Sequence, residues 1–179
     1  MAIIMNNTKK LIYAALMTAL IIVCSWISIP AVVPFTLQTF AVFCALGFLG
    51  CGYGGLAIAA YILLGAFGLP VFSGFVGGVG RLFGPTGGYI WGFLLSAVLF
   101  GIVKKLLGEA RLSDFFAMLA GLVGCYSFGT IWFVQVYSGG SDMTYASALS
   151  VCVLPFILPD LLKIIVACRL IKRIKPHIF

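Results

Sequence analysis

The sequence predicts an all-helical integral membrane protein, and three observations carry this prediction. Of the 179 residues, 63% are hydrophobic and only 8% are charged, whereas soluble domains have about half apolar and a quarter charged residues. The mean hydropathy is +1.23. Residues 11–80 contain no Asp, Glu, Lys or Arg. These features exclude a water-soluble globule, and the richness in aromatic and β-branched residues excludes a disordered chain.

The length limits the number of crossings. A helix needs about 20 residues to cross the hydrocarbon core, so the chain has room for at most about six or seven crossings. We predict a single transmembrane domain over residues 1–179. Its six helices are expected at 8–29, 35–50, 53–68, 88–104, 114–137 and 146–172.

The first three helices have unusual lengths or ends. The first is stopped by Pro30 and Pro34, and its apolar run is too long for a signal peptide, so we expect it to be retained. The runs 35–50 and 53–68 would each cover about 24 Å, which is less than the roughly 30 Å core. Short segments bounded by glycine or proline indicate broken or tilted helices, whose irregular backbone is tolerated where it lines a cavity.

Residues 69–88 form the longest irregular stretch, with seven glycines and two prolines. One interpretation is a flexible outside loop. The other is a re-entrant lid, in which bare backbone such as that of Gly78 approaches a ligand closely.

Basic residues predict the topology. With six helices and a cytoplasmic N-terminus, Arg81 alone falls in an outside loop, and nine other Lys and Arg residues fall inside. These nine are Lys9, Lys10, Lys104, Lys105, Arg111, Arg169, Lys172, Arg173 and Lys175. We therefore expect both termini in the cytoplasm. The formal charge of +7 reflects this topology and does not indicate a nucleic-acid partner.

Several classes of protein are disfavoured by motifs that the sequence lacks. There is no GxxxxGK[ST] motif, so the chain hydrolyses no nucleotide by itself. The six cysteines form no CxxC pair, and we expect free thiols that act as small hydrophobic groups. The lone histidine, His177, lies in a basic tail. No metal site, cofactor site or catalytic site is predicted, so we do not expect an enzyme.

Asp160 and Lys163 interrupt the otherwise apolar last helix. A charged residue within the bilayer costs about 2.5–3.5 kcal/mol on insertion scales, and such residues are usually functional. Their i, i+3 spacing places both on one face. They form either an internal salt bridge that lets the helix insert, or a polar ligand site in which Lys163 offers three donors to an anion.

Four further positions are candidates for ligand contact. Arg81 could bind a ligand carboxylate or reach to water. Gln38 is polar at the start of a short helix, where it could bind ligand or clamp irregular backbone. Phe35 and Tyr89 belong to a set of aromatic residues that could line a pocket, although such residues more often belong to the core or to the membrane interface.

Small residues at four-residue spacing predict close helix packing. Ala15 and Ala19 form one stripe; the others are Gly88, Gly92 and Ser96, and Ala117, Gly121 and Cys125. Most such stripes pack internal helices, but one on an outer helix could receive a partner protein.

The segments VPFTLQTFAVF, GLPVFSG, FGPTGGYIWGF and LPDLLK together resemble the BioY family, the biotin-specific S components of energy-coupling-factor transporters. The resemblance covers nearly the whole chain. It implies a six-helix membrane protein that captures biotin outside and delivers it through a complex with a transmembrane scaffold subunit and two ATPases. Biotin is then the ligand, and ATP is used only by the partner subunits.

The resemblance also assigns residues. The stretch from Ala15 to Ala19 is similar to the AxxxA scaffold-docking motif of the family, and Asp160 and Lys163 correspond to its polar ligand pair. Biotin suits an aromatic pocket with one acid and one or two cations, because it has an apolar ring and chain, a ureido group and a carboxylate.

The residues alone leave other functions open. Riboflavin or thiamine could be the ligand instead of biotin. A non-transporting membrane scaffold or small channel, in which the charged pair is structural, belongs to a second class.

Overall fold

The structure is a computed structural model, which describes residues 7–108, 110, 112–137 and 144–178 of the chain, with side chains to residue 176. Arg111 and residues 138–143, which lie between the predicted helices 114–137 and 146–172, are outside the described residues. The elements in chain order are α1 (Asn7–Trp26), β1 (Ser28–Ile29), β2 (Phe35–Thr36), α2 (Gln38–Ala66), α3 (Val79–Phe83), α4 (Gly87–Leu107), α5 (Ser113–Tyr137), α6 (Tyr145–Cys152) and α7 (Leu154–Ile178).

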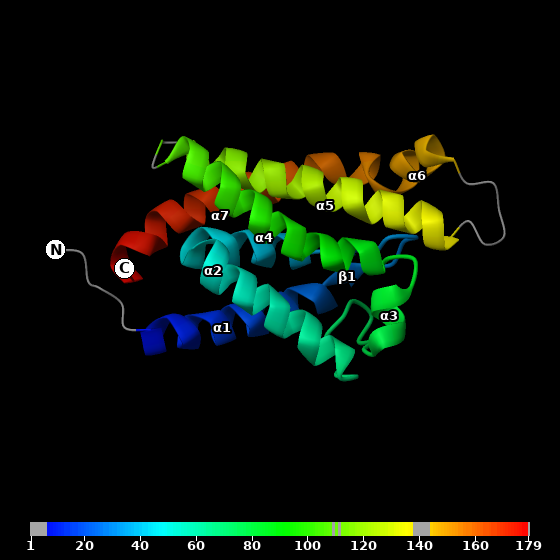
Figure 1. The fold of residues 1–179 in the computed structure, drawn as a ribbon, viewed down its shortest axis with the longest axis horizontal. Helices are drawn as coiled ribbons and strands as arrows, with labels where there is room; N and C mark the ends of the chain where they lie inside the picture. The colour runs from blue at the N-terminus through cyan, green and yellow to red at the C-terminus, as the bar shows by residue number, and fades with distance from the viewer. Residues whose placement is uncertain (1–6, 109, 111, 138–143, 179) are drawn as a thin grey trace.

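The described elements are helical apart from one small ribbon, as the prediction of an all-helical fold requires. Four helices, α1, α2, α4 and α5, are long and apolar enough to cross a membrane. The pair α6 and α7, bent by 45° at residue 153, passes the same test as a fifth span. Figure 1 shows the start of α1 and the end of α7 at one end of the bundle, with α3 and α6 at the other.

Helix α2 is a helical hairpin rather than one straight span. Gly50 has φ +73° and ψ −178°, a conformation outside the helical region that L side chains rarely adopt. The two arms run back along each other, because Gln38 donates to the Tyr61 hydroxyl over 3.0 Å and a Cβ on Gly54 would lie 2.7 Å from the Ala45 carbonyl oxygen. The predicted segments 35–50 and 53–68 correspond to these two arms.

The segment between α1 and α2 and the segment between α2 and α4, both at the α3 and α6 end of the bundle, contain more secondary structure than the sequence indicates. The first helix was expected to reach residue 29, but it ends at Trp26, and Ser28–Ile29 pairs antiparallel with Phe35–Thr36. Pro30 and Pro34 lie in the turn of this ribbon, where no helical hydrogen bond is lost. The glycine-rich stretch contains α3 and a bridge between Phe72 and Val76.

The small-residue stripes of α4 and α5 pack against each other. A Cβ on Gly92 would lie 2.9 Å from the Cys125 sulfur, and a Cβ on Gly121 would lie 3.1 Å from that of Ser96. The Ser96 hydroxyl also donates to the Gly121 carbonyl over 2.7 Å. Close backbone approach therefore joins α4 and α5, which form the largest interface of the bundle.

The cysteines are free thiols, as expected. Four of them are buried, Cys168 is half-buried and Cys51 is exposed, so the interpretation as small buried hydrophobic groups holds for most but not for Cys51.

Candidate ligand-binding site

A pocket that is partly open to solvent lies inside the bundle towards the end that carries α3 and α6. The space in it that no protein atom fills, open solvent included, is about 690 Å³. Its lining comes from the β2 region, both arms of α2, the glycine-rich stretch and α4 to α7: Val33, Pro34, Thr36, Gln38, Thr39, Tyr61, Phe72, Ser73, Arg81, Thr86, Tyr89, Ile90, Phe93, Cys125, Tyr126, Cys152, Phe156, Asp160 and Lys163.

Asp160 and Lys163 from α7 form the buried end of the pocket, with 2% and 8% exposure. The Lys163 ammonium lies 2.6 Å from Asp160 Oδ1. It also donates to the Thr36 carbonyl over 2.7 Å and to the Thr39 hydroxyl over 3.0 Å. All three N–H bonds of the ammonium therefore have an acceptor within the protein.

The Asp160 carboxylate is held equally firmly. Besides Lys163, its Oδ1 accepts from the Thr39 hydroxyl over 3.0 Å, and its Oδ2 accepts from the Tyr126 hydroxyl over 2.5 Å. The Phe35 ring lies against the cation, with its centroid 4.3 Å from Lys163 Nζ. The charges of the pair cancel, so the buried end is polar but carries no net charge.

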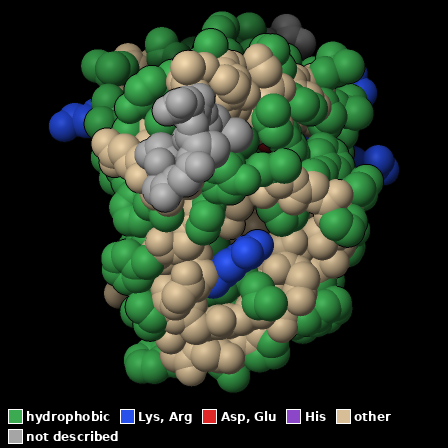
Figure 2. Space-filling view, turned by 90° about the vertical axis from the view of Figure 1, so that its right-hand side faces the viewer, with side chains coloured by type: hydrophobic (Ala, Val, Ile, Leu, Met, Phe, Trp, Pro, Cys, Tyr) green, Lys and Arg blue, Asp and Glu red, His purple; other side chains and the backbone are tan. Residues whose placement is uncertain are grey.

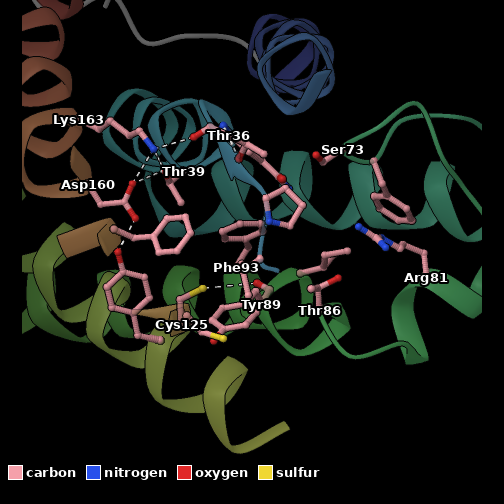
Figure 3. Close-up of a pocket in the computed structure, with 18 of the residues that line it drawn as sticks. Thr36, Thr39, Ser73, Arg81, Thr86, Tyr89, Phe93, Cys125, Asp160 and Lys163 are labelled. Atoms are coloured by element: carbon pink, nitrogen blue, oxygen red, sulfur yellow. Dashed lines mark hydrogen bonds and ion pairs between the residues drawn. The ribbon is translucent and has the colours of Figure 1, made fainter. Parts of the chain in front are cut away.

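Arg81 lies at the opposite end of the pocket. Figure 3 shows its guanidinium near Ser73 and Thr86, far from Asp160 and Lys163. These three residues are half-buried, in contrast to the buried end. Among the described residues no carboxylate pairs with Arg81. In Figure 2, which faces this end of the bundle, a basic side chain lies near the centre of a largely uncharged face, beside a hollow.

Aromatic and amide side chains line the middle. The Gln38 amide nitrogen donates to the buried Tyr61 hydroxyl, which leaves the amide oxygen as an acceptor. The Tyr89 hydroxyl shares a hydrogen bond of 3.1 Å with Thr130. Phe72, Phe93 and Phe156 complete an apolar wall between the two polar ends.

The structure brings most of the predicted site residues together. Asp160, Lys163, Arg81, Gln38 and Tyr89 line one pocket. Phe35 lies beside it, against Lys163 and stacked on Phe156 at 5.9 Å.

Gly78 is not among the lining residues. Its amide donates to the Gly65 carbonyl over 2.7 Å and its φ is +96°, so it anchors the glycine-rich stretch on the second arm of α2.

Sequence reasoning missed Thr36, Thr39 and Tyr126. The two threonines are three residues apart in the segment PFTLQTF, on either side of Gln38, and this group of polar residues in an apolar stretch was a usable signal. Tyr126 had no such signal, because a tyrosine in an apolar helix is common.

Ala15 and Ala19 lie far from the pocket on the outer face of α1. Both are exposed, whereas Ala14 and Thr18 on the same helix are buried. The Thr18 hydroxyl donates to the Ala57 carbonyl over 3.1 Å, so Thr18 marks the face that packs on α2.

The sequence model of the BioY family matches residues 1–178, which is almost the whole chain. The chain belongs to the BioY family. A curated BioY relative, the biotin transporter BioY of Thermotoga maritima, is 44% identical over 93% of this chain and 96% of its own length. The probable biotin transporter BioY of Pyrococcus horikoshii is 36% identical over 94% of this chain and 98% of its own length.

The BioY fold is also found among solved structures. The crystal structure of the S-component for biotin from an ECF-type ABC transporter superimposes with a TM-score of 0.85 at 30% identity, and covers 96% of this chain and 95% of that one. The family and the apolar spans together make this chain a multi-pass membrane protein.

Proposed function

We infer that this chain is the membrane subunit that captures biotin outside the cell for an energy-coupling-factor transporter, and that it is not an enzyme. The observation that carries the inference is the charge pattern of the pocket. One end is polar without net charge, the middle is apolar and aromatic, and the mouth holds a single cation. Biotin has the same sequence of chemical groups from its ureido ring to its carboxylate.

The carboxylate of biotin belongs at the Arg81 end. Arg81 is the only basic residue between Lys10 and Lys104, and its fork of N–H donors matches a carboxylate. At the other end, Lys163 is already saturated and Asp160 repels an anion. An anionic group therefore gains most at the mouth.

The ureido group belongs at the buried end. It brings two N–H donors, and the acceptors left there are Asp160 Oδ2 and the Gln38 amide oxygen. Lys163 then acts on the ligand through Asp160, instead of donating hydrogen bonds to an anionic group of the ligand. The thioether ring and alkyl chain lie against the phenylalanine side chains between the ends.

The other vitamins fit this pattern less well. Thiamine is a cation and meets Arg81 at the mouth, and riboflavin has no carboxylate to pair with it. A non-transporting scaffold or channel would have no need of a pocket with an apolar wall between two polar ends.

Uptake requires partner subunits. Because the sequence contains no nucleotide-binding loop, a transmembrane scaffold and two ATPases would supply the energy. We place the scaffold contact on the outer face of α1 at Ala15 and Ala19, which no described helix covers.

The test is a titration of purified protein, expressed in biotin-poor medium so that the pocket is empty. Biotin should bind saturably at one site per chain, and riboflavin and thiamine should not compete. Saturable binding of another vitamin, or of none, would contradict the assignment.

A further inference from the structure

Tyr126 contacts the polar end of the pocket from a different helix than the charged pair. It lies on α5, whereas Asp160 and Lys163 lie on α7 and Thr39 lies on α2. Its hydroxyl donates to Asp160 Oδ2 over 2.5 Å, a distance in the range of short bonds to a charged acceptor. Figure 3 shows dashed contacts that reach Asp160 from the side of Lys163 and Thr39 and from the opposite side.

The contacts of Asp160 leave limited capacity for a ligand. A carboxylate has about four lone-pair directions. Lys163 and Thr39 occupy those of Oδ1, and Tyr126 occupies one of Oδ2. About one direction of Oδ2 is therefore left, and Tyr126 decides where it points, because no other described side chain donates to that oxygen.

The threonine and the lysine cannot replace this contact. Thr39 has one proton, which it donates to Oδ1 while accepting from Lys163. The protons of Lys163 are directed to Oδ1, Thr39 and the Thr36 carbonyl. Loss of the Tyr126 hydroxyl would leave Oδ2 without a fixed partner next to the ligand.

We propose that Tyr126 is a positioning residue for ligand recognition. Its hydroxyl fixes Asp160 Oδ2 so that the remaining lone pair receives one N–H of a cyclic urea. This proposal rests on the proposed function for the identity of the ligand, but the contact between Tyr126 and Asp160 is independent of it.

The first experiment is a double-mutant cycle on biotin affinity. Tyr126→Phe should weaken binding at least fivefold, while Tyr53→Phe, which removes an exposed hydroxyl at the other end of the bundle, should have no effect. In the Asp160→Ala background, Tyr126→Phe should cause no further loss, because it acts through Asp160. Equal losses in both backgrounds, or wild-type affinity in Tyr126→Phe, would overturn the proposal.

The second experiment needs no ligand. The chain has only four acidic residues, so the carboxylate stretch of Asp160 can be identified in infrared difference spectra as the band that Asp160→Asn removes. Tyr126→Phe should shift this band, and Tyr53→Phe should leave it in place. An unshifted band overturns the proposal even if binding in the Asp160→Ala background is too weak to measure. Absence of biotin binding by the wild type, with the band still shifted, contradicts the proposed function but supports the positioning contact.

Discussion

Asp160 and Lys163 combine the two roles between which the sequence left the choice open. They form a buried salt bridge, and they also line the pocket. The bridge explains how two charges are tolerated at 2% and 8% exposure, since each has further hydrogen-bond partners. The site therefore presents a fixed carboxylate to a ligand, not a free ammonium.

Removal of either charge should weaken biotin binding while the protein still inserts. Asp160→Ala leaves Lys163 buried without its counter-ion, and Lys163→Ala does the same to Asp160 and frees the Thr36 carbonyl. We expect the biotin affinity of each variant to fall more than tenfold in titrations of purified protein, which corresponds to about 1.4 kcal/mol of binding free energy.

Lys104→Ala is the matched control, because it breaks the more exposed ion pair with Asp114 at 2.9 Å. If both variants of the buried pair fold and bind biotin like the wild type, the pair has only a structural role.

Arg81 should matter only for ligands with a carboxylate. Arg81→Ala removes the cation at the mouth, so biotin affinity should fall about tenfold or more, whereas Arg81→Lys should retain part of it. Biotinol, in which an alcohol replaces the carboxylate, should bind the wild type and Arg81→Ala equally. Competition titrations with both ligands measure this. If Arg81→Ala lowered the affinities for biotinol and biotin by the same factor, the biotin carboxylate would not bind at Arg81.

The sequence predicted the residues of the site that stand out chemically. Asp160, Lys163 and Arg81 are charges in apolar surroundings, and Gln38 is polar where an aliphatic residue inserts more cheaply. Tyr126 was not found, because its role arises where α5 and α7 meet at one carboxylate. Such contacts between distant segments have no local signature.

At the level of elements, the sequence predicted the break at Gly50 but not the one at Val153. A glycine-rich run between two short apolar segments indicates a turn, and Gly50 supplies the required positive φ. Residues 146–172 were expected as one helix. The chain instead bends at Val153, and Pro159 lies inside α7. Proline is tolerated in the first turn of a helix, so Pro155, directly after the bend, marks a helix start that the prediction of one continuous helix passed over.

Two loop segments should be mobile in the empty protein and ordered by biotin. Residues 30–36 and 69–78 contribute pocket residues such as Pro34 and Ser73. The second segment has few internal hydrogen bonds and is held to the end of α1 by two side chains. The Trp26 indole donates to the Pro70 carbonyl over 2.8 Å and stacks on Phe75 at 5.1 Å, and the Ser25 hydroxyl donates to the Val71 carbonyl.

Hydrogen exchange followed by mass spectrometry measures this ordering. Biotin should slow amide exchange in both segments, because ligand contacts add to weak local structure. Exchange in the α4 and α5 interface should not change and serves as the internal reference. If saturating biotin changed the amide exchange of neither segment, their role as lids would be contradicted.

At the level of the whole molecule, the start of α1 and the end of α7 lie together at one end of the bundle (Figure 1), whereas residues of α3 and α6 line the pocket towards the other end. This arrangement agrees with an even number of crossings. The cytoplasmic position of the termini stays a prediction from the basic residues. The pocket near one end and the proposed docking stripe of alanines on α1 therefore lie on separate surfaces.

That separation gives the last prediction. Ala15→Trp or Ala19→Trp should leave biotin binding intact but reduce biotin uptake and copurification with the scaffold and ATPase subunits. A bulky side chain on an exposed small-residue stripe holds a partner helix away and loses dispersion contacts along the seam. Binding and complex assembly should be measured on the same preparations.

Two comparison variants separate docking from internal packing. Ala14→Trp places the same bulk on the buried face of α1, at 4% exposure, and should lower thermal stability and biotin binding together. Ala146→Trp, on the exposed side of α6, should change neither binding nor assembly. Because Ala14 and Ala15 are adjacent in sequence but the first is buried and the second exposed, the contrast between them depends only on which surface is covered. If Ala15→Trp behaved like Ala14→Trp, with binding and assembly lost in parallel, the stripe would pack within this chain and the scaffold would dock elsewhere.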